Sequence, residues 1–244
     1  MPLIAEKTRG IVLQQIKYSD SQLIAHIYTE KFGRQTFMFR KPKSKKSGSS
    51  LNILQPLFLL EIEAQMKEKR QIQRAREIRN YPHFSDIPFN IAKSSIAIFL
   101  SEILSRVLKE EEANPDLFDF LHHAILLLDE EQEHYANFHL LFLFELSKYL
   151  GFYPESDFSE NNKIFNLAEG KYTQQHQEIK FSLNENESQL LNYLSGKGFH
   201  QLGAIKLSRM QKHLLLDVLL KYYHFHLPEM GKVKSLEVLK QVFN

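Results

Sequence analysis

The sequence predicts an α+β protein in which a five-stranded β-barrel is followed by an all-helical domain. Through the first 80 residues, short runs of alternating apolar and polar residues are separated by turn-forming residues, which is typical of β-strands. From residue 90 onward the apolar spacing changes to the three-and-four repeat of helices. The composition is that of a globular chain, since 43% of the 244 residues are hydrophobic and 25% are charged. We expect the two domains to span residues 1–80 and 81–244.

Five strands are expected in the first domain. The turn at residues 31–33 contains Gly33 and indicates a hairpin between the second and third strands. Pro56 is tolerable at the start of the fourth strand. Residues 69–80 are ambiguous between a strand and a helix, and we interpret them as a strand running into a turn. Five short strands favour a closed barrel, because closure leaves no exposed sheet edge. The expected strands are residues 10–18, 22–30, 34–41, 56–65 and 69–80.

The second domain is expected to be a bundle of helices. Asn114 and Pro115 should end its first helix, and Gly151 should end its third. Residues 152–185 are rich in turn-forming residues and poor in periodicity, so we expect an irregular excursion there. The expected helices are residues 90–114, 116–128, 135–150, 185–194, 208–227 and 235–243.

The composition excludes several classes of protein. Cysteine is absent, which rules out disulfides and every thiolate-ligated zinc or iron–sulfur site. The N-terminus lacks the hydrophobic segment of a secretory signal. The most apolar run, residues 138–150, is too short and too charged to span a bilayer. We therefore expect a cytoplasmic protein without membrane contact.

Signatures of enzymes also fail. Residues 195–198 superficially resemble a phosphate-binding loop, but Leu191 stands where that pattern needs glycine. The histidine pairs at 122–123 and 224/226 lack carboxylates at a spacing that would complete a metal site. We expect no catalytic residues, no metal ligands and no enzymatic activity.

Cations gather in one part of the sequence although the formal net charge is only +2. No Asp or Glu occurs from Lys31 to Leu60, a window that contains seven Lys and Arg residues. A second basic group at residues 67–79 is diluted by Glu68 and Glu77. A barrel would bring the end of the third strand close to the last strand, so the two groups could merge into one stripe. The residues expected to bind a polyanion are Lys31, Arg34, Arg40, Lys41, Lys43, Lys45, Lys46, Arg70, Arg74 and Arg76.

Such a stripe would bind nucleic acid by counterion release, and an idle solvated loop is the alternative. Each phosphate neutralised on a single strand contributes a salt slope of about −0.7, so five contacts give roughly −3.5. Exposed aromatic side chains could add base stacking worth about 1–3 kcal/mol per base. Phe37 and Phe39 fit a barrel core better than a stacking surface, although the sequence leaves this open. The candidates for stacking are Tyr18, Tyr28, Phe32, Phe37 and Phe39.

Motifs in a fixed order along the chain resemble the RecO family of bacterial DNA repair and recombination-mediator proteins. They are G-x-V-L at 10–13, Y-S-D-S at 18–21, Y-T-E-K-F-G at 28–33, L-Q-P-L-F-x-L-E at 54–61, KYLGFYP at 148–154 and LKYYHFHLPEMGKVKSLEVL at 220–239.

This resemblance implies an OB-fold barrel, a helical domain and activity without catalysis. A family member binds single- and double-stranded DNA, anneals complementary strands and works with RecR to help RecA replace SSB on DNA. It also implies that the acidic tail of SSB binds the helical domain, and that the protein is nucleoid-associated.

One feature departs from the family pattern. Many members carry a four-cysteine zinc module after the GFYP-like segment, where this chain has no cysteine. We therefore expect no cofactor, and in particular no zinc. The excursion must then stay mobile or be held by packing of Phe158, Ile164, Phe165, Leu167 and Tyr172.

Two other functions remain open from the residues alone. The barrel could belong to a protein-interaction adaptor that docks acidic partner tails and touches nucleic acid only incidentally. A metal-dependent hydrolase that uses the histidines is the third possibility. For the leading hypothesis, the basic residues Lys232 and Lys234 could extend the DNA-binding surface.

Overall fold

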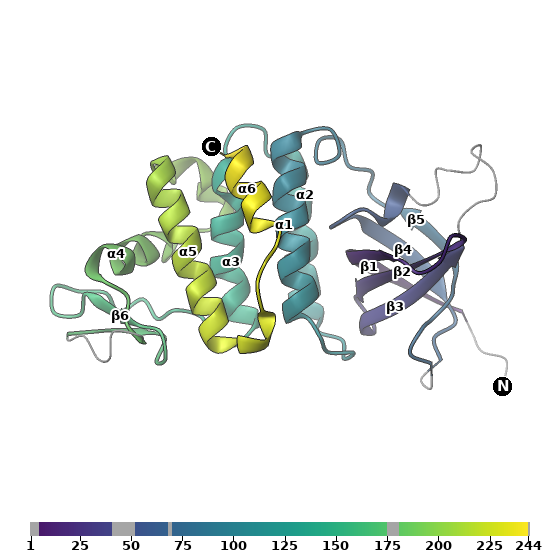
Figure 1. Ribbon diagram of the computed structural model, residues 1–244, viewed down its shortest axis with the longest axis horizontal. Helices are drawn as coiled ribbons and strands as arrows, with labels where there is room; N and C mark the ends of the chain where they lie inside the picture. The colour runs from purple at the N-terminus through teal and green to yellow at the C-terminus, as the bar shows by residue number, and fades with distance from the viewer. Residues whose placement is uncertain (1–4, 41–51, 68–69, 175–180, 244) are drawn as a thin grey trace. The chain divides into compact units, whose positions relative to one another are not determined.

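The computed structural model describes residues 5–40, 52–67, 70–174 and 181–243 of the chain (Figure 1). The chain consists of two compact units, Met1–Glu130 and Glu131–Asn244. The first unit contains the sheet and the first two helices, so these helices belong with the barrel. The strands are β1 Glu6–Lys17, β2 Gln22–Thr29, β3 Gly33–Arg40, β4 Leu59–Ala64 and β5 Ala75–Asn80. The five predicted strands are confirmed, and the ambiguous fifth run is a strand only in its second half.

The sheet is antiparallel throughout, with the order β3-β2-β1-β4-β5. Gln73, just before β5, closes it by forming a parallel bridge with Phe37 of β3. The backbone N–H of Gln73 donates to Thr36 O at 2.7 Å, and the N–H of Met38 donates to Gln73 O at 3.1 Å. The sheet is thereby a closed five-stranded barrel, as an OB-fold requires. Its core includes Ile11, Leu23, Ala25, Ile27, Phe37, Leu60 and Ile62.

Two helices complete the first unit: α1 (Ile91–Val107) and α2 (Pro115–Glu130). The side chain of Asn90 caps α1 by accepting hydrogen bonds from the N–H groups of the second and third helical residues. The helix ends at Val107, earlier than the predicted residue 114. Residues 110–112 are three glutamates, and negative charge is unfavourable at the C-terminal end of a helix dipole.

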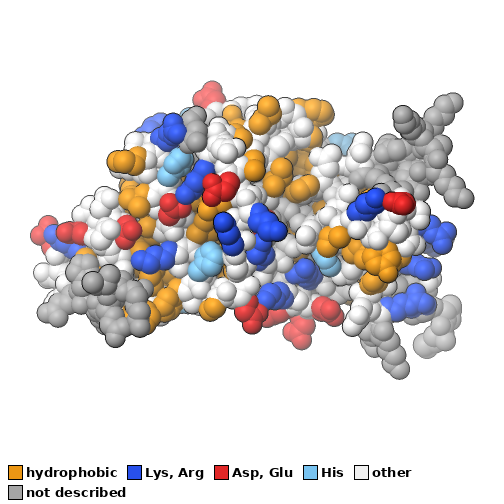
Figure 2. Space-filling view, viewed as in Figure 1, with side chains coloured by type: hydrophobic (Ala, Val, Ile, Leu, Met, Phe, Trp, Pro, Cys, Tyr) orange, Lys and Arg blue, Asp and Glu red, His pale blue; other side chains and the backbone are white. Residues whose placement is uncertain are grey.

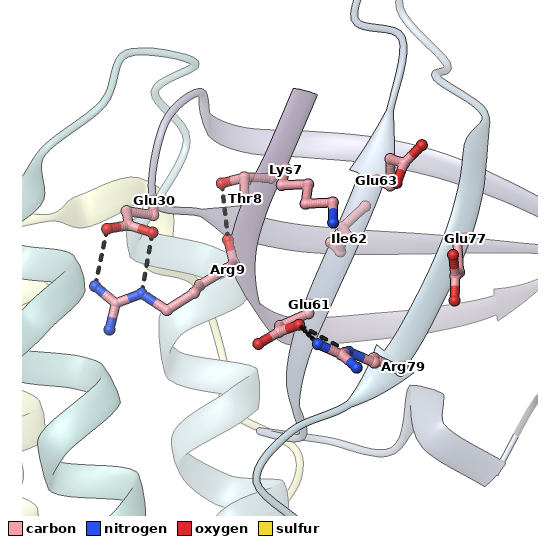
Figure 3. Close-up of a pocket in the computed structure, with 9 residues that line it drawn as sticks. All are labelled: Lys7, Thr8, Arg9, Glu30, Glu61, Ile62, Glu63, Glu77 and Arg79. Atoms are coloured by element: carbon pink, nitrogen blue, oxygen red, sulfur yellow. Dashed lines mark hydrogen bonds and ion pairs between the residues drawn. The ribbon is translucent and has the colours of Figure 1, made fainter. Parts of the chain in front are cut away.

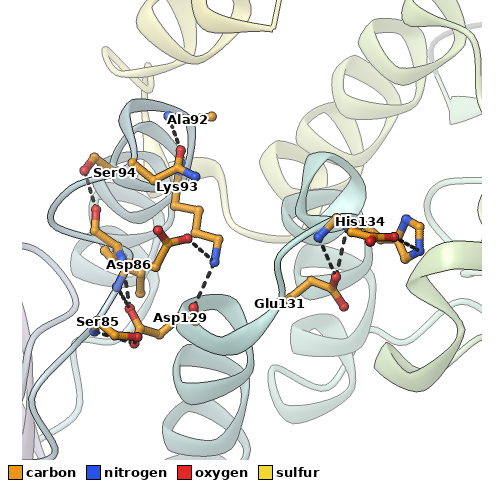
Figure 4. A network of polar contacts seen from close by, with 11 residues as sticks. Ser85, Asp86, Ala92, Lys93, Ser94, Asp129, Glu131 and His134 are labelled. Atoms are coloured by element: carbon orange, nitrogen blue, oxygen red, sulfur yellow. Dashed lines mark hydrogen bonds and ion pairs between the residues drawn. The ribbon is translucent and has the colours of Figure 1, made fainter.

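A buried polar network ties the segment before α1 to the end of α2 (Figure 4). Lys93 is fully buried, and its Nζ lies 2.6 Å from Asp86 Oδ2 and 2.8 Å from the backbone oxygen of Asp129. The Asp129 carboxylate accepts backbone N–H groups from Ser85, Asp86 and Ile87 at 2.8, 2.9 and 2.8 Å. Burial alone would raise the pKa of Asp129, but these N–H donors together lower that pKa below its usual value.

The second unit is mainly helical. Its helices are α3 Phe138–Tyr149, α4 Glu185–Leu194, α5 Arg209–His226 and α6 Leu236–Val242, which confirms the predicted ones. Apolar residues surround α3 on every side, so this helix is the centre of the core. The Tyr223 hydroxyl on α5 donates to Leu143 O at 2.7 Å. Among the described residues, no helix combines the length and apolar character needed to cross a bilayer.

A small hairpin lies in the region predicted to be an irregular excursion. It pairs β6 (Ile164–Asn166) with β7 (Lys171–Thr173), and Gly170 supplies the positive φ of 67° before β7. The Phe165 ring is fully buried, with centroids 5.0 Å from Tyr172 and 5.3 Å from Tyr222 of α5. Of the five residues predicted to hold this segment, Ile164, Phe165, Leu167 and Tyr172 are buried and Phe158 is half-buried against Tyr172, so the packing prediction is confirmed.

Candidate nucleic-acid interface

The outer face of β1, β2 and β3 carries a line of apolar side chains. Ile16 pairs with Ile24 across β1 and β2, and Ile24 pairs with Met38 across β2 and β3. Cross-strand partners point to the same face of a sheet, and on β2 the residues on either side of Ile24, Leu23 and Ala25, are buried in the core. Ile16 is 41% exposed, and Ile24 and Met38 are half-buried. We call these three residues the apolar row.

Arginines stand at one end of this face. Arg40 pairs with Gln22 one step beyond the apolar row and is exposed. Gln73 points into the barrel with 3% exposure, so Arg74 beside it points outward, next to Met38. The Gln73 amide donates to Arg70 O at 2.8 Å and thus anchors the segment that carries Arg70.

Arg40, Arg70 and Arg74 are all exposed, and within the described residues none of them forms an ion pair. We call them the open arginines. Figure 2 shows Lys and Arg side chains beside a hydrophobic patch on the part of the surface that the barrel forms. Within the described residues, therefore, no carboxylate forms an ion pair with these three arginines.

Arg34 lies at the opposite end of β3 and has a structural role. Its Nη1 donates to Ser105 O at 2.8 Å and to Leu108 O at 2.9 Å, at the C-terminal end of α1. Burial lowers the pKa of Arg34 from its ordinary value. Six residues of strand separate it from Arg40, a distance of about 20 Å. The guanidinium predicted to bind DNA is therefore engaged with the helix end, and Arg34 is not part of the surface proposed below.

The backbone explains why the strand approaches α1 so closely there. Gly33 has φ +59°, and a Cβ at this position would clash with the backbone oxygen of Glu112, in the segment that follows α1. Only glycine fits at this position. The close approach allows the N–H of the next residue, Arg34, to donate a hydrogen bond to Glu110 O at 3.0 Å.

Lys31 and Arg76 were also predicted to bind DNA, and both face carboxylates. Lys31 Nζ lies 4.0 Å from Glu6, and Arg76 Nη1 lies 3.2 Å from Glu63. Arg79 pairs with Glu61 in the same way. In this part of the barrel the cations do not form an uninterrupted stripe, because β4 places glutamates beside the arginines of β5; the roles of Lys31 and Arg76 in DNA binding stay predictions.

The Arg79–Glu61 pair lines a hollow of about 510 Å³ on the outer face of β1, β4 and β5 (Figure 3). In it Arg9 points to Glu30, with nitrogen–oxygen distances of 2.8 and 3.0 Å, and Arg79 points to Glu61. Four carboxylates and three cations line this hollow, and Arg76 pairs with Glu63 beside it, so the positive charges on this side are largely compensated. The lining residues are Lys7, Thr8, Arg9, Glu30, Glu61, Ile62, Glu63, Glu77 and Arg79.

Of the aromatic residues predicted to stack on bases, only Tyr18 is largely exposed. Tyr28 is 3% exposed, so it belongs to the core and is not available for stacking; Phe37 is fully buried, which confirms the barrel-core reading favoured for it. Phe39 is half-buried and stacks on Phe37 at a centroid distance of 6.3 Å, and Phe32 is also half-buried. Tyr18 is 62% exposed, and its N–H donates to Gln22 O at 3.2 Å, beside Arg40.

The lysines at the centre of the sequence prediction lie outside the described residues. They follow Arg40 directly in the sequence, so their role in binding stays a prediction. These residues are Lys41, Lys43, Lys45 and Lys46.

Sequence reasoning missed Ile16, Ile24 and His26 as surface residues of this face. The signal was available for β2, since Ile24 and His26 alternate with Leu23, Ala25 and Ile27. His26 Nδ1 lies 3.0 Å from Thr36 Oγ1, and burial, followed by the charge of Arg34, lowers the pKa of His26. A neutral polar pair thus flanks the apolar row on the side away from Arg40.

The second unit carries a hollow of about 100 Å³ between α3, α5 and α6, which we call the α5–α6 cup. Leu216, Leu239 and Phe243 provide its apolar lining, and Arg209, Lys212 and Lys240 its cations. Burial lowers the pKa of His139, which also lines the cup, to about 3, so this imidazole stays neutral. No carboxylate is among the described residues that line the cup.

The residues do not fit a zinc module. A four-cysteine site cannot form, since the sequence has no cysteine. In the part of the chain that the structure describes, no three His, Asp or Glu side chains gather where they could hold a metal ion.

Comparison with known proteins agrees with this architecture. Residues 1–81 match the family model "Recombination protein O N terminal", and residues 88–237 match "Recombination protein O C terminal". The chain is 36% identical to DNA repair protein RecO of Bacteroides fragilis over 240 residues, which cover 98% of this chain and 99% of the relative. It is 39% identical to DNA repair protein RecO of Flavobacterium psychrophilum over 239 residues, with the same coverage. An OB-type barrel, a helical second unit and these two matches together place the chain in the RecO family of DNA repair proteins.

Proposed function

We propose that this chain is a non-enzymatic recombination mediator. It binds single- and double-stranded DNA, anneals complementary strands and, with RecR, helps to load RecA onto DNA coated by SSB. The observation that carries this proposal is the group of open arginines at one end of the barrel, where the described residues provide no carboxylate to pair with them. Family membership supports the same reading.

Annealing follows from charge neutralisation. Three phosphate contacts on a single strand give a salt slope of about −2, and seven, with the four lysines that follow Arg40, give about −5. Neutralised backbones approach one another, and base pairing alone then selects the partner strand. No bond is made or broken, so catalytic residues are not needed.

Strand annealing across a salt series, with and without SSB on the strands, tests the proposal. Replacing Lys43, Lys45 and Lys46 together by glutamate should slow annealing strongly and flatten the salt dependence of binding. Unchanged annealing and unchanged oligonucleotide affinity at low salt would refute the proposal.

The α5–α6 cup supports a second, compatible function: docking of an acidic tail such as that of SSB. Its apolar lining suits a hydrophobic terminal side chain, and Arg209 and Lys212 suit the carboxylates of such a peptide. Burial lowers the pKa of Lys212, which indicates a partly desolvated ammonium that gains from an anionic partner.

The two functions are separable by competition. An acidic peptide should bind without displacing an oligonucleotide, and Lys212→Glu should abolish peptide binding while leaving oligonucleotide binding intact. Lys221→Glu, an exposed change elsewhere on α5, is the matched control. A peptide that competes fully with the oligonucleotide would instead favour an adaptor whose barrel docks acidic tails.

We also propose that the chain needs no zinc. The aromatic packing around Phe165 and the lack of cysteine in the sequence support this proposal. Elemental analysis of the purified protein tests this, and stoichiometric zinc would contradict it.

A further inference from the structure

We infer that the apolar row contacts DNA bases and makes the outer face of β1–β3 selective for single strands over duplexes. This inference rests on the proposed function, because it assumes that the open arginines hold phosphates. It adds that the DNA bases lie between those phosphates and the sheet.

The apolar row is unusual for its position. The exposed face of an antiparallel sheet is normally polar while the opposite face fills the core. Here Leu23, Ala25 and Phe37 fill the core, yet the outward positions next to them are Ile24 and Met38. With Ile16 they form a continuous apolar surface across three neighbouring strands, about 10 Å wide at the usual strand spacing.

The surroundings of the row indicate what covers it. Arg74 lies beside Met38, and Arg40 lies two residues farther along β3, at the next position on the same face. A nucleic acid strand held by these two arginines would place the groups attached to its backbone over the row. Tyr18 adds an exposed aromatic ring at the Arg40 end.

Charge argues for nucleic acid rather than a protein segment as the occupant. Arg40 and Arg74 form no ion pair among the described residues, whereas Lys17 next to Ile16 is paired with Asp20, and Arg79 and Arg76 on the β4–β5 face are paired with Glu61 and Glu63. Arginines beside an apolar surface fit a ligand that has an anionic backbone and carries flat, apolar groups. Single-stranded DNA has that chemistry.

The same geometry discriminates between forms of DNA. In a duplex the base faces are stacked on one another and only the base edges reach the grooves. In a single strand the base faces are free to lie on side chains, and such contacts tolerate any sequence. The row therefore adds affinity for single strands that duplexes do not receive, while the arginines serve both.

The test replaces the row without changing charge. Ile24→Thr with Met38→Gln makes the row polar without adding charge; Gln keeps the length of Met, and Thr is one non-hydrogen atom smaller than Ile. Met210→Gln on α5 is the matched control at a methionine that is 78% exposed. Binding of the full chain to a single-stranded oligonucleotide and to its duplex is measured by fluorescence anisotropy at several salt concentrations. Thermal unfolding checks the fold, and Ile16→Thr at the most exposed position of the row is a milder second variant.

We expect the double variant to bind single strands about ten-fold more weakly, a loss of about 1.4 kcal/mol. Its duplex affinity and its salt slope should be unchanged, because the phosphate contacts remain. Unchanged single-strand affinity, or equal losses for both forms of DNA, would overturn the inference. The proposed function would survive that result if Arg74→Gln still weakened binding to both forms, and it would fail if Arg74→Gln had no effect.

Discussion

Replacing Arg74 by glutamine should weaken DNA binding, whereas the same replacement at Arg76 should not. The two arginines lie two residues apart, and both are exposed. They differ in their neighbours, since Arg76 Nη1 lies 3.2 Å from Glu63 Oε1 and Arg74 has no ion-pair partner among the described residues. The pair therefore isolates the effect of neutralisation by a carboxylate.

The expected magnitude follows from one lost phosphate contact. Removing one contact changes the salt slope by about 0.7, which corresponds to about eight-fold weaker binding at 0.05 M salt and about three-fold at 0.2 M. Arg76→Gln removes a charge that Glu63 already compensates, and we expect its affinity and slope to match those of the unmodified protein.

Fluorescence anisotropy with a labelled oligonucleotide, titrated at four or five salt concentrations, measures both quantities. Thermal unfolding of each variant verifies that the barrel is intact. If Arg76→Gln lost as much affinity as Arg74→Gln, with the same change of slope, the reasoning that β4 glutamates remove Arg76 from the interface would be wrong.

Three further outcomes follow from contacts within each unit. Arg34→Gln should lower the free energy of unfolding by about 1–3 kcal/mol through the lost hydrogen bonds to α1, and leave oligonucleotide affinity nearly unchanged; denaturant titration and anisotropy check both parts. The pKa of Asp129 is lower in the folded chain than in the unfolded chain, so the ionised carboxylate stabilises the fold above the unfolded pKa, and this stabilisation is lost as pH falls through the folded pKa. The contribution of Asp129 to the free energy of unfolding should be flat from pH 5 to 8 and decline below about pH 4. Asp129→Asn should remove this pH dependence from melting curves. Phe165→Ala should destabilise the hairpin region by about 3–5 kcal/mol, whereas a strong chelator should leave the melting temperature unchanged, and a chelator-induced drop would contradict zinc-free packing.

Local patterns were sufficient to predict most of the fold. Alternation located the strands, and Asn114–Pro115 correctly separated two helices, because both signals arise within a few neighbouring residues. The end of α1 was placed too late, since the periodic apolar positions did not reveal the cost of three glutamates at its C-terminal end.

The interface was harder to predict because charge compensation depends on cross-strand register. The sequence shows Arg76 and Glu63 thirteen positions apart, and only the pairing of β4 with β5 brings them together. Arg34 lies in a window free of Asp and Glu, yet backbone carbonyls of α1 occupy its guanidinium. No pattern of charged side chains can reveal a partner that is main chain.

The barrel is sealed at Gln73, where two backbone hydrogen bonds join β3 to the segment before β5. Arg74, the next residue, is the proposed phosphate contact, so bound DNA would lie directly beside these two hydrogen bonds. The rate of amide hydrogen exchange at Met38 and Gln73 should therefore change when DNA binds at Arg74.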